Sequence, residues 1–205
     1  VFEENMEIIL KAFNEESFSH KGPRHTIPAE VPYRGYEMTD VTLVPRPVNL
    51  PVEIWQPITS GRSIEFMAQH GIKGMVALTG EVMADEMISN YQTAYKNAGK
   101  DVALGENIAF GVGFYIADSK TEAMEKVRPY HDERYKWFAP FGYVRYTDEE
   151  GRPWGTPGAP ARTPRVEDGV EQKAWFCGSS EEFVSYLKGI EEKYPGLEDV
   201  VFQWP

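Results

Sequence analysis

The sequence has 205 residues, of which 41% are hydrophobic, and a formal net charge of −11 at pH 7. A chain of this length can bury a core without disulfides, and its acidity argues against nucleic acid or an anionic membrane as a partner. Cys177 is the single cysteine and no apolar run approaches the length of a membrane span, so we expect a cytoplasmic protein without an intramolecular disulfide.

Helices and strands alternate along the chain. Apolar residues at helical spacing predict helices over residues 2–13, 64–70 and 84–98. Runs of apolar residues predict four strands, and the longest run suits a strand covered on both faces. The predicted strands lie at residues 52–58, 72–78, 108–117 and 200–204.

Two further helices are predicted from their starting motifs. Ser-x-x-Glu patterns that begin at Ser119 and Ser179 are typical of capping boxes. We expect the first of these helices to run to about Val127 and to break or kink at Pro129, because proline disrupts helical hydrogen bonding. We expect the second to stop before Pro195.

This alternation indicates βα units and a parallel sheet, either doubly wound or closed as a barrel. Two segments interrupt it. Residues 18–51 are rich in proline and contain a short β-like run at 41–44, and residues 138–173 are rich in Gly, Pro and Arg. A loop of that length in a compact domain is usually a lid, a binding loop or disordered, and we interpret residues 138–173 as a lid or insertion loop.

Both ends of the pattern look interrupted. The first predicted helix has no strand before it, and the last predicted strand has no helix after it. A (β/α)8 barrel typically needs about 250 residues, and an open sheet of four parallel strands would leave two raw edges. We therefore expect residues 1–205 to be one domain, truncated at both ends, that forms roughly the second half of a barrel.

The turn at residues 59–63 (TSGRS) is the best candidate for a binding site. It leads into a helix, and a helix N-terminus presents unpaired N–H groups and the positive end of the dipole to an anion. Ser60, Ser63 and Arg62 add hydrogen-bond donors, and Gly61 allows close approach of a phosphate. Alternatively, the serines only cap the helix, and the residues taken alone favour this interpretation because caps far outnumber phosphate sites.

Other site types lack their usual motifs. The histidines do not have the spacing of metal ligands, so we predict no metal site. Gly111 and Gly113 lie inside a predicted strand and do not form a dinucleotide fingerprint. No feature marks Cys177 as an activated nucleophile, and the sequence assigns no catalytic residue.

Six segments together resemble the bacterial luciferase-like family of flavin-dependent monooxygenases. They are residues 2–13 (FEENMEIILKAF), 18–22 (FSHKG), 44–48 (VPRPV), 51–55 (PVEIW), 66–71 (FMAQHG) and 177–183 (CGSSEEF). Their order and spacing carry the resemblance, which covers nearly the whole chain except the insertion at 138–173. Ser180 stands where proline is usual in the family.

The resemblance implies an α/β fold, namely the second half of a TIM-like (β/α)8 barrel of the luciferase-like type, with four βα units and a long insertion. It implies a monooxygenase that uses FMN, reduced by a separate reductase, and O2 to oxidise a small organic substrate. Ser60 and Ser63, with backbone N–H groups near Gly61 and Arg62, would bind the flavin phosphate. Residues 138–173 would be the mobile loop that shields the reactive flavin from water.

Two alternatives stay open. An F420-dependent oxidoreductase uses the same barrel, and a partial barrel could hold flavin or another phosphorylated ligand without turnover. The family's first four strands carry much of the flavin pocket and have no counterpart here, so this half alone would hardly perform the reaction. Expected partners are a small-molecule substrate, a flavin reductase and another subunit, identical or different, with no nucleic acid and no membrane.

Overall fold

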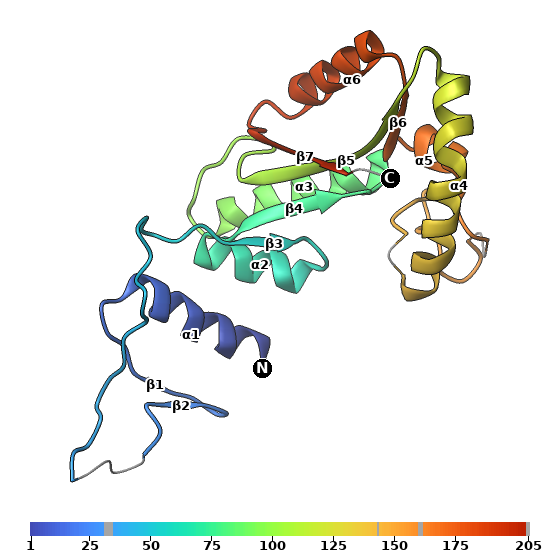
Figure 1. Ribbon diagram of the computed structural model, residues 1–205. Helices are drawn as coiled ribbons and strands as arrows, with labels where there is room; N and C mark the ends of the chain where they lie inside the picture. The colour runs from blue at the N-terminus through green and yellow to red at the C-terminus, as the bar shows by residue number, and fades with distance from the viewer. Residues whose placement is uncertain (31–34, 143, 160–161, 204–205) are drawn as a thin grey trace. The chain divides into compact units, whose positions relative to one another are not determined.

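The computed structural model describes residues 1–30, 35–142, 144–159 and 162–203. The chain forms two compact units, Val1–Ile54 and Trp55–Pro205. In the first unit, helix α1 (Phe2–Asn14) is followed by an antiparallel hairpin of two short strands, as Figure 1 shows. The hairpin strands are β1 (His20–Lys21) and β2 (Thr26–Ile27).

Glu4 fastens the hairpin to α1. Its Oε1 accepts hydrogen bonds from the backbone N–H groups of Arg24 and His25, both at 3.1 Å, and lies 3.2 Å from Nε2 of His20.

The β-like run predicted at residues 41–44 is not a strand. It makes one isolated antiparallel bridge, between Val41 and Phe18.

The second unit contains a five-stranded sheet in which every pairing is parallel. The four predicted strands are confirmed, and the structure adds a fifth, whose four residues lie between the predicted insertion and the helix that begins after Ser179. The strands are β3 (Trp55–Pro57), β4 (Lys73–Ala77), β5 (Ile108–Ile116), β6 (Trp175–Gly178) and β7 (Asp199–Gln203).

Strand β5 is the centre of this sheet. It pairs with β4 through residues 108–111, with β6 through residues 113–116 and with β7 through residues 109–113. The carbonyl of Gly111 accepts from Leu78, beside β4, and the N–H of Gly113 donates to Ala174, beside β6. Backbone groups two residues apart point to the same edge of a strand, so β4 and β6 share one edge of β5 in tandem and β7 takes the other.

One face of the sheet is covered by α2 (Gly61–His70), α3 (Glu81–Asn97) and α6 (Ser180–Lys193). Phe114 of β5 stacks on Phe183 of α6, with ring centroids 4.9 Å apart. Helix α2 packs on α3, and Nζ of Lys193 at the end of α6 lies 2.9 Å from Glu81 of α3. Figure 1 shows α2 beside β3 and α6 beside β7, at the two ends of the row of strands.

The opposite face is covered only at the carboxyl end of β5. There α4 (Lys120–Phe138) and α5 (Val166–Glu171) pack around a buried hydrophobic cluster. The buried members of this cluster are Ala123, Val127, Tyr135, Tyr146, Val166, Ala174, Trp175 and Cys177.

The rest of that face carries Lys73 and Asp199 at the amino-terminal ends of β4 and β7. Its apolar part, here called the open face, includes Pro57, Met75, Ala77, Ala109, Gly111 and Val201. Directly paired residues of a sheet share a face, and the pairing aligns Ala77, Gly111 and Val201 in one row across β4, β5 and β7. Pro57, Ala77 and Val201 are exposed, and 44% of the surface of Val201 is accessible. The open face is therefore an apolar sheet surface that no described element covers.

Helix α4 continues through Pro129, so the expected end near residue 127 was wrong. Proline removes one helical hydrogen bond. On either side of it, however, Val127, His131 and Tyr135 are buried in the unit, and most helical stability in proteins comes from such packing. The helix therefore reaches Phe138, the first residue of the predicted insertion.

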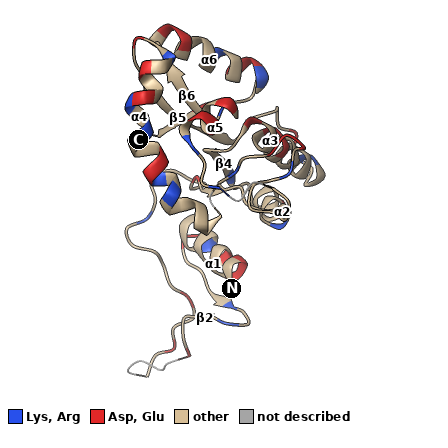
Figure 2. Ribbon diagram, turned by 90° about the vertical axis from the view of Figure 1, so that its right-hand side faces the viewer, with Lys and Arg blue, Asp and Glu red and all other residues tan. Residues whose placement is uncertain are grey.

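The predicted insertion is only partly a loop. It holds a short 3-10 helix, η1 (Ala139–Phe141), and then α5. Ser119 and Ser179 both start the helices predicted from them, since each serine Oγ accepts the N–H of the glutamate three residues later at 3.2 Å. The full capping box is confirmed at Ser179, whose own N–H donates to Glu182 at 2.8 Å, whereas Ser119 caps α4 without that second bond. Figure 2 shows the acidic residues at the start of α6. Among the described residues, no helix is both long and apolar enough to cross a membrane.

Candidate functional site

The turn at residues 59–63 joins β3 to α2, with Ser60 as the N-cap. Oγ of Ser60 accepts from the N–H of Ser63 at 3.3 Å, and the N–H of Ser60 donates to Oγ of Ser63 at 3.1 Å. Oγ of Ser63 also donates to the carbonyl of Ser60 at 2.8 Å. The two serines thus make a reciprocal capping box, as the simpler interpretation predicted, and their role in binding phosphate stays a prediction.

The electrostatics of this turn suit an anion. Each of α1, α3, α4, α5 and α6 has Glu or Asp in its first turn, where a carboxylate offsets the positive end of the helix dipole. Helix α2 has no acidic residue there. A Cβ atom placed on Gly61 would meet no atom within 4 Å, so the space over the backbone is open. Ser60, Gly61 and Arg62 are exposed and Ser63 is half-buried.

A cavity of about 400 Å³ borders this turn but does not enclose it. It is lined by α2 and α3, and Gly61 is the one residue of the turn that reaches it. Neither Ser60 nor Ser63 lines it, so the described residues do not form a walled flavin pocket around the turn.

Arg145 links the predicted insertion to the carboxyl-terminal ends of β3 and β4. Its backbone forms a parallel bridge with Thr79 and accepts the N–H of Gly80 at 2.8 Å. Its Nη1 donates to the carbonyl of Ile58 at 2.8 Å and lies 3.6 Å from Sδ of Met87. No motif in the sequence singled out this residue. The strand-like run at residues 144–147 (VRYT) was the signal that could have revealed it.

Gln172 joins two parts of the same insertion to each other and to the start of α3. Its Oε1 accepts the N–H of Thr147 at 3.0 Å, and its Nε2 donates to the carbonyl of Thr147. Its own carbonyl accepts the N–H of Glu81 at the start of α3, at 2.8 Å. The insertion is therefore fixed to the ends of the strands by the contacts of Arg145 and Gln172.

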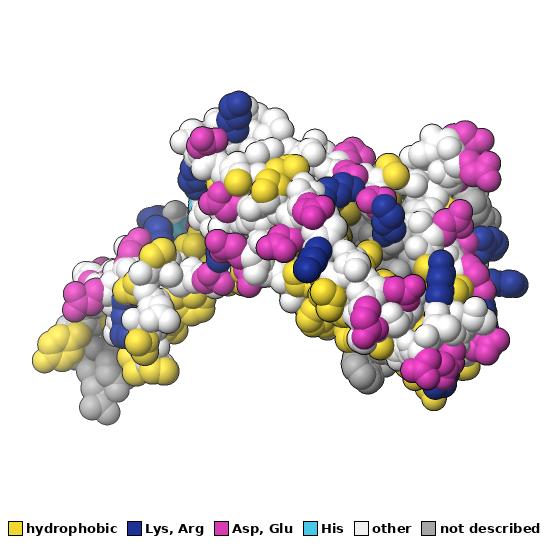
Figure 3. Space-filling view, turned by 90° about the horizontal axis from the view of Figure 1, so that it is seen from above, with side chains coloured by type: hydrophobic (Ala, Val, Ile, Leu, Met, Phe, Trp, Pro, Cys, Tyr) yellow, Lys and Arg dark blue, Asp and Glu magenta, His cyan; other side chains and the backbone are white. Residues whose placement is uncertain are grey.

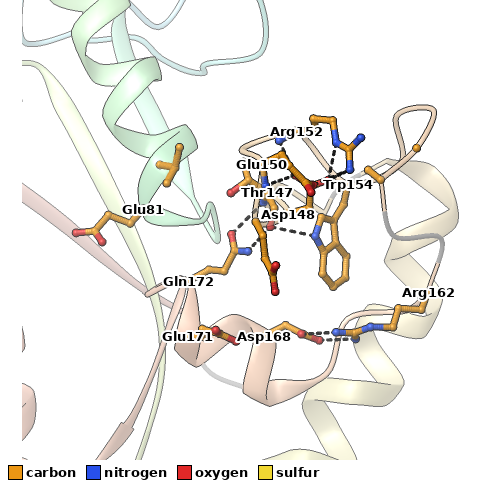
Figure 4. Close-up of a pocket in the computed structure, with 14 residues that line it drawn as sticks. Glu81, Thr147, Asp148, Glu150, Arg152, Trp154, Arg162, Asp168, Glu171 and Gln172 are labelled. Atoms are coloured by element: carbon orange, nitrogen blue, oxygen red, sulfur yellow. Dashed lines mark hydrogen bonds and ion pairs between the residues drawn. The ribbon is translucent and has the colours of Figure 1, made fainter.

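A larger cavity of about 710 Å³ lies between the insertion, α5 and the first turn of α3 (Figure 4). Its arginines are paired, since Arg152 lies 2.7 Å from Asp148 and Arg162 lies 2.6 Å from Asp168. Partial burial raises the pKa of Asp168, but Arg162 and backbone N–H groups outweigh it and lower the pKa below its usual value. In Figure 4 the two ion pairs lie on opposite sides of the cavity, with Trp154 beside the first.

A buried polar cluster lies under the insertion. His131 is fully buried, and its Nδ1 lies 2.9 Å from Oδ1 of Asp132, which also accepts the N–H of Val166 at 2.9 Å. Burial lowers the pKa of His131, and Asp132 offsets only part of that effect. Nε2 of His131 and the hydroxyl of Tyr146 have no hydrogen-bond partner among the described residues. We conclude that His131 is neutral in the folded protein.

The remaining chemistry-bearing groups form no further centre. Cys177 is buried, and burial raises the pKa of its thiol to about 11, which keeps the thiol protonated at neutral pH. In the part of the chain that the structure describes, no three His, Cys, Asp or Glu side chains are placed to hold a metal ion. Figure 3 shows acidic side chains spread over the visible surface with Lys and Arg between them.

Comparison with known proteins gives one family and one fold. The profile of the luciferase-like monooxygenases matches residues 1–194. Monooxygenase RslO1 from Streptomyces bottropensis is 18% identical at a TM-score of 0.66, and the match covers 98% of this chain and 53% of that one. The oxygenating constituent of 3,6-diketocamphane monooxygenase from Pseudomonas putida, solved with FMN, is 19% identical at a TM-score of 0.66, with coverages of 98% and 55%.

The riboflavin lyase RcaE, solved with modified FMN and riboflavin, is 14% identical at a TM-score of 0.61, with coverages of 99% and 52%. No curated protein matches the sequence. The chain thus spans about half the length of these structures. At such identities the likeness shows the fold, and it confirms the predicted class, a parallel α/β sheet that corresponds to about half of a luciferase-like TIM barrel.

Proposed function

Because this chain belongs to the luciferase-like monooxygenase family, we propose that it is part of an FMN-dependent monooxygenase. Such an enzyme uses reduced flavin and O2 to oxidise a small organic substrate. The observation that carries the proposal is the family match over residues 1–194, nearly the whole chain. Two structures of similar fold were solved with FMN or modified FMN, which supports flavin as the cofactor class.

In this proposal the turn at residues 59–63 binds the flavin phosphate. The first turn of α2 carries no acidic residue, and the space over Gly61 is open. Backbone N–H groups of Gly61 and Arg62, at the start of the helix, would donate to phosphate oxygens, and the hydroxyls of Ser60 and Ser63 would add donors. Flavin supplies the oxidation chemistry, and this chain binds the cofactor, orients it and excludes water.

The insertion has the second role. Arg145 and Gln172 hold it at the carboxyl-terminal ends of the strands, where barrel enzymes place their active sites. We propose that it covers the flavin and keeps water from the reacting atoms. The reductant would come from a separate flavin reductase, and the small substrate would bind beside the insertion.

The open face supports a complete barrel as the working form. An exposed apolar sheet surface is unfavourable in water, and further parallel strands would bury it. We propose that these strands come either from the same polypeptide or from a partner subunit, so the working enzyme is larger than the described half barrel.

A binding titration tests the phosphate assignment. In the intact protein, replacement of both serines (Ser60→Ala with Ser63→Ala) should weaken FMN binding by about tenfold or more, as loss of hydrogen bonds to a charged group does. Binding of riboflavin, which lacks the phosphate, should change little. Flavin fluorescence measures both affinities.

Ser119→Ala is the matched control, because it removes an N-cap of the same type from α4. Each lost cap should lower the free energy of unfolding by about 1 kcal/mol. FMN affinity that is the same in the double variant and in the control would contradict the assignment and leave the serines as caps. Flavin binding without oxidation of any substrate in a panel, with reduced FMN and O2, would favour a non-catalytic flavin protein.

A further inference from the structure

Arg145 holds a half-buried positive charge that the described carboxylates do not neutralise. Its Nη1 donates to the neutral carbonyl of Ile58 at 2.8 Å, and the nearby Sδ of Met87 is neutral as well. No carboxylate of the described residues lies within ion-pair distance of it, and burial alone lowers its pKa. The guanidinium is therefore desolvated without a compensating anion, which is an unfavourable state for a buried charge.

Three other arginines around the insertion are paired. Arg128 lies 2.5 Å from Glu167, and Arg152 and Arg162 each contact an aspartate. The chain carries 32 acidic residues against 21 Lys and Arg, so carboxylates are abundant. An unpaired arginine in such a chain is a specific feature and not the result of a shortage of acids.

The position of Arg145 connects this charge to the turn at residues 59–63. Ile58, whose carbonyl binds the guanidinium, immediately precedes the turn. The backbone of Arg145 is itself held by Thr79 and Gly80 at the end of β4. A guanidinium has five N–H donors in a rigid fork, so donors remain after one is used by Ile58.

We infer that Arg145 is a ligand-binding residue that supplies the fixed positive charge for a phosphate monoester bound at the turn. The inference rests on the proposed binding of a phosphorylated cofactor at residues 59–63. It adds a contact from the insertion, so that one anion would be bound by the β3–α2 turn and by the covering segment together. The phosphate would belong to the flavin or to a phosphorylated substrate, two sources with the same chemistry.

Paired titrations of the intact protein with FMN and riboflavin test the inference. Arg145→Gln should weaken FMN binding by about tenfold to a hundredfold, the range for loss of a hydrogen bond to a charged group, and should leave riboflavin binding within about twofold. Arg145→Lys keeps the charge and should retain part of the FMN affinity. Arg128→Gln removes an arginine of the same region and should change neither affinity.

Each outcome decides a different point. Equal weakening of FMN and riboflavin by Arg145→Gln would overturn the inference while flavin binding stands, and so would unchanged binding of FMN, riboflavin and inorganic phosphate. Arg145→Gln could instead leave both flavin affinities unchanged while inorganic phosphate no longer raises the melting temperature of the variant. That result would assign the bound phosphate to the substrate. A wild-type protein that binds neither FMN nor inorganic phosphate would contradict both the proposed function and this inference.

Discussion

Gly113 of β5 packs directly against the buried indole ring of Trp175 on the neighbouring strand, β6. A Cβ atom at this position would lie 2.5 Å from the indole ring of Trp175, far below a normal contact. Trp175 is 1% exposed, and its Nε1 donates to the hydroxyl of Tyr135 at 3.2 Å, so the ring has no room to move. Only glycine allows β5 and β6 to pair under this ring.

Gly113→Ala should therefore lower the free energy of unfolding by about 1–3 kcal/mol, the usual result of overpacking a core. Urea denaturation followed by circular dichroism measures the change. Gly189→Ala is the control, because a Cβ there meets nothing within 4 Å and alanine favours a helix. A Gly113→Ala variant as stable as the wild type would show that the sheet can shift to make room.

At the scale of elements, the features predicted correctly are those that depend on residues close together in the sequence. Ser119 and Ser179 begin helices as N-caps because their hydrogen bonds join residues three apart. Strand β6 escaped prediction because its four residues are stabilised by pairing with β5, some 60 residues earlier in the chain. Arg145 was missed for the same reason, since its partner Ile58 lies 87 residues away.

His131 couples α4 to α5 and makes their packing sensitive to pH. Its pKa is lowered in the folded state by burial, against an ordinary value of 6.5. The unfolded chain therefore binds the proton more readily below pH 6.5, and stability should be full above that pH and fall as the pH decreases. Asp132 and Asp168 favour the protonated form and Arg134 opposes it, but burial outweighs them.

The measurement is the urea midpoint at pH 8 and pH 5.5. The wild type should lose more stability between these values than His131→Gln, by no more than about 1.4 kcal/mol per pH unit. The variant corrects for every other titrating group, because it shares them all. Equal losses in the two proteins would mean that His131 has the same pKa in the folded and unfolded states.

At the scale of the whole molecule, the fold class and the exposure of an apolar face followed from the alternation of helices and strands, but the residues of the open face did not. Hydrophobic periodicity shows that a residue such as Val201 is apolar and does not show what covers it. The structure places Val201 opposite Gly111 in the centre of the open face, with 44% of its surface accessible. Such exposure of an apolar residue in the middle of a sheet is unfavourable in water, and it agrees with the proposed complete barrel.

Val201→Asp distinguishes the two states of this face. In the 205-residue chain alone the change should alter stability by no more than about 0.5 kcal/mol, as at other surface positions. In the complete barrel it would bury an unpaired carboxylate, so the barrel should unfold several degrees earlier and lose FMN. Val184→Asp, at an exposed position on α6, should be harmless in both. Equal tolerance of both changes in the intact protein would refute a covered face.

The tandem sharing of one β5 edge has a consequence for which parts of the fold can change independently. Residues 108–111 of β5 hold β4, while residues 113–116 hold β6 and with it α4, α5 and the insertion. Among the pairings of the named strands, the segment from α4 to β6 is thus attached through residues 113–116 alone, beyond the register that aligns β4 and most of β7. Replacement of that segment would leave the pairing of residues 108–112 with β4 and β7 intact, so the strand framework and its cover can change separately as long as the contacts of Arg145 and Gln172 are kept.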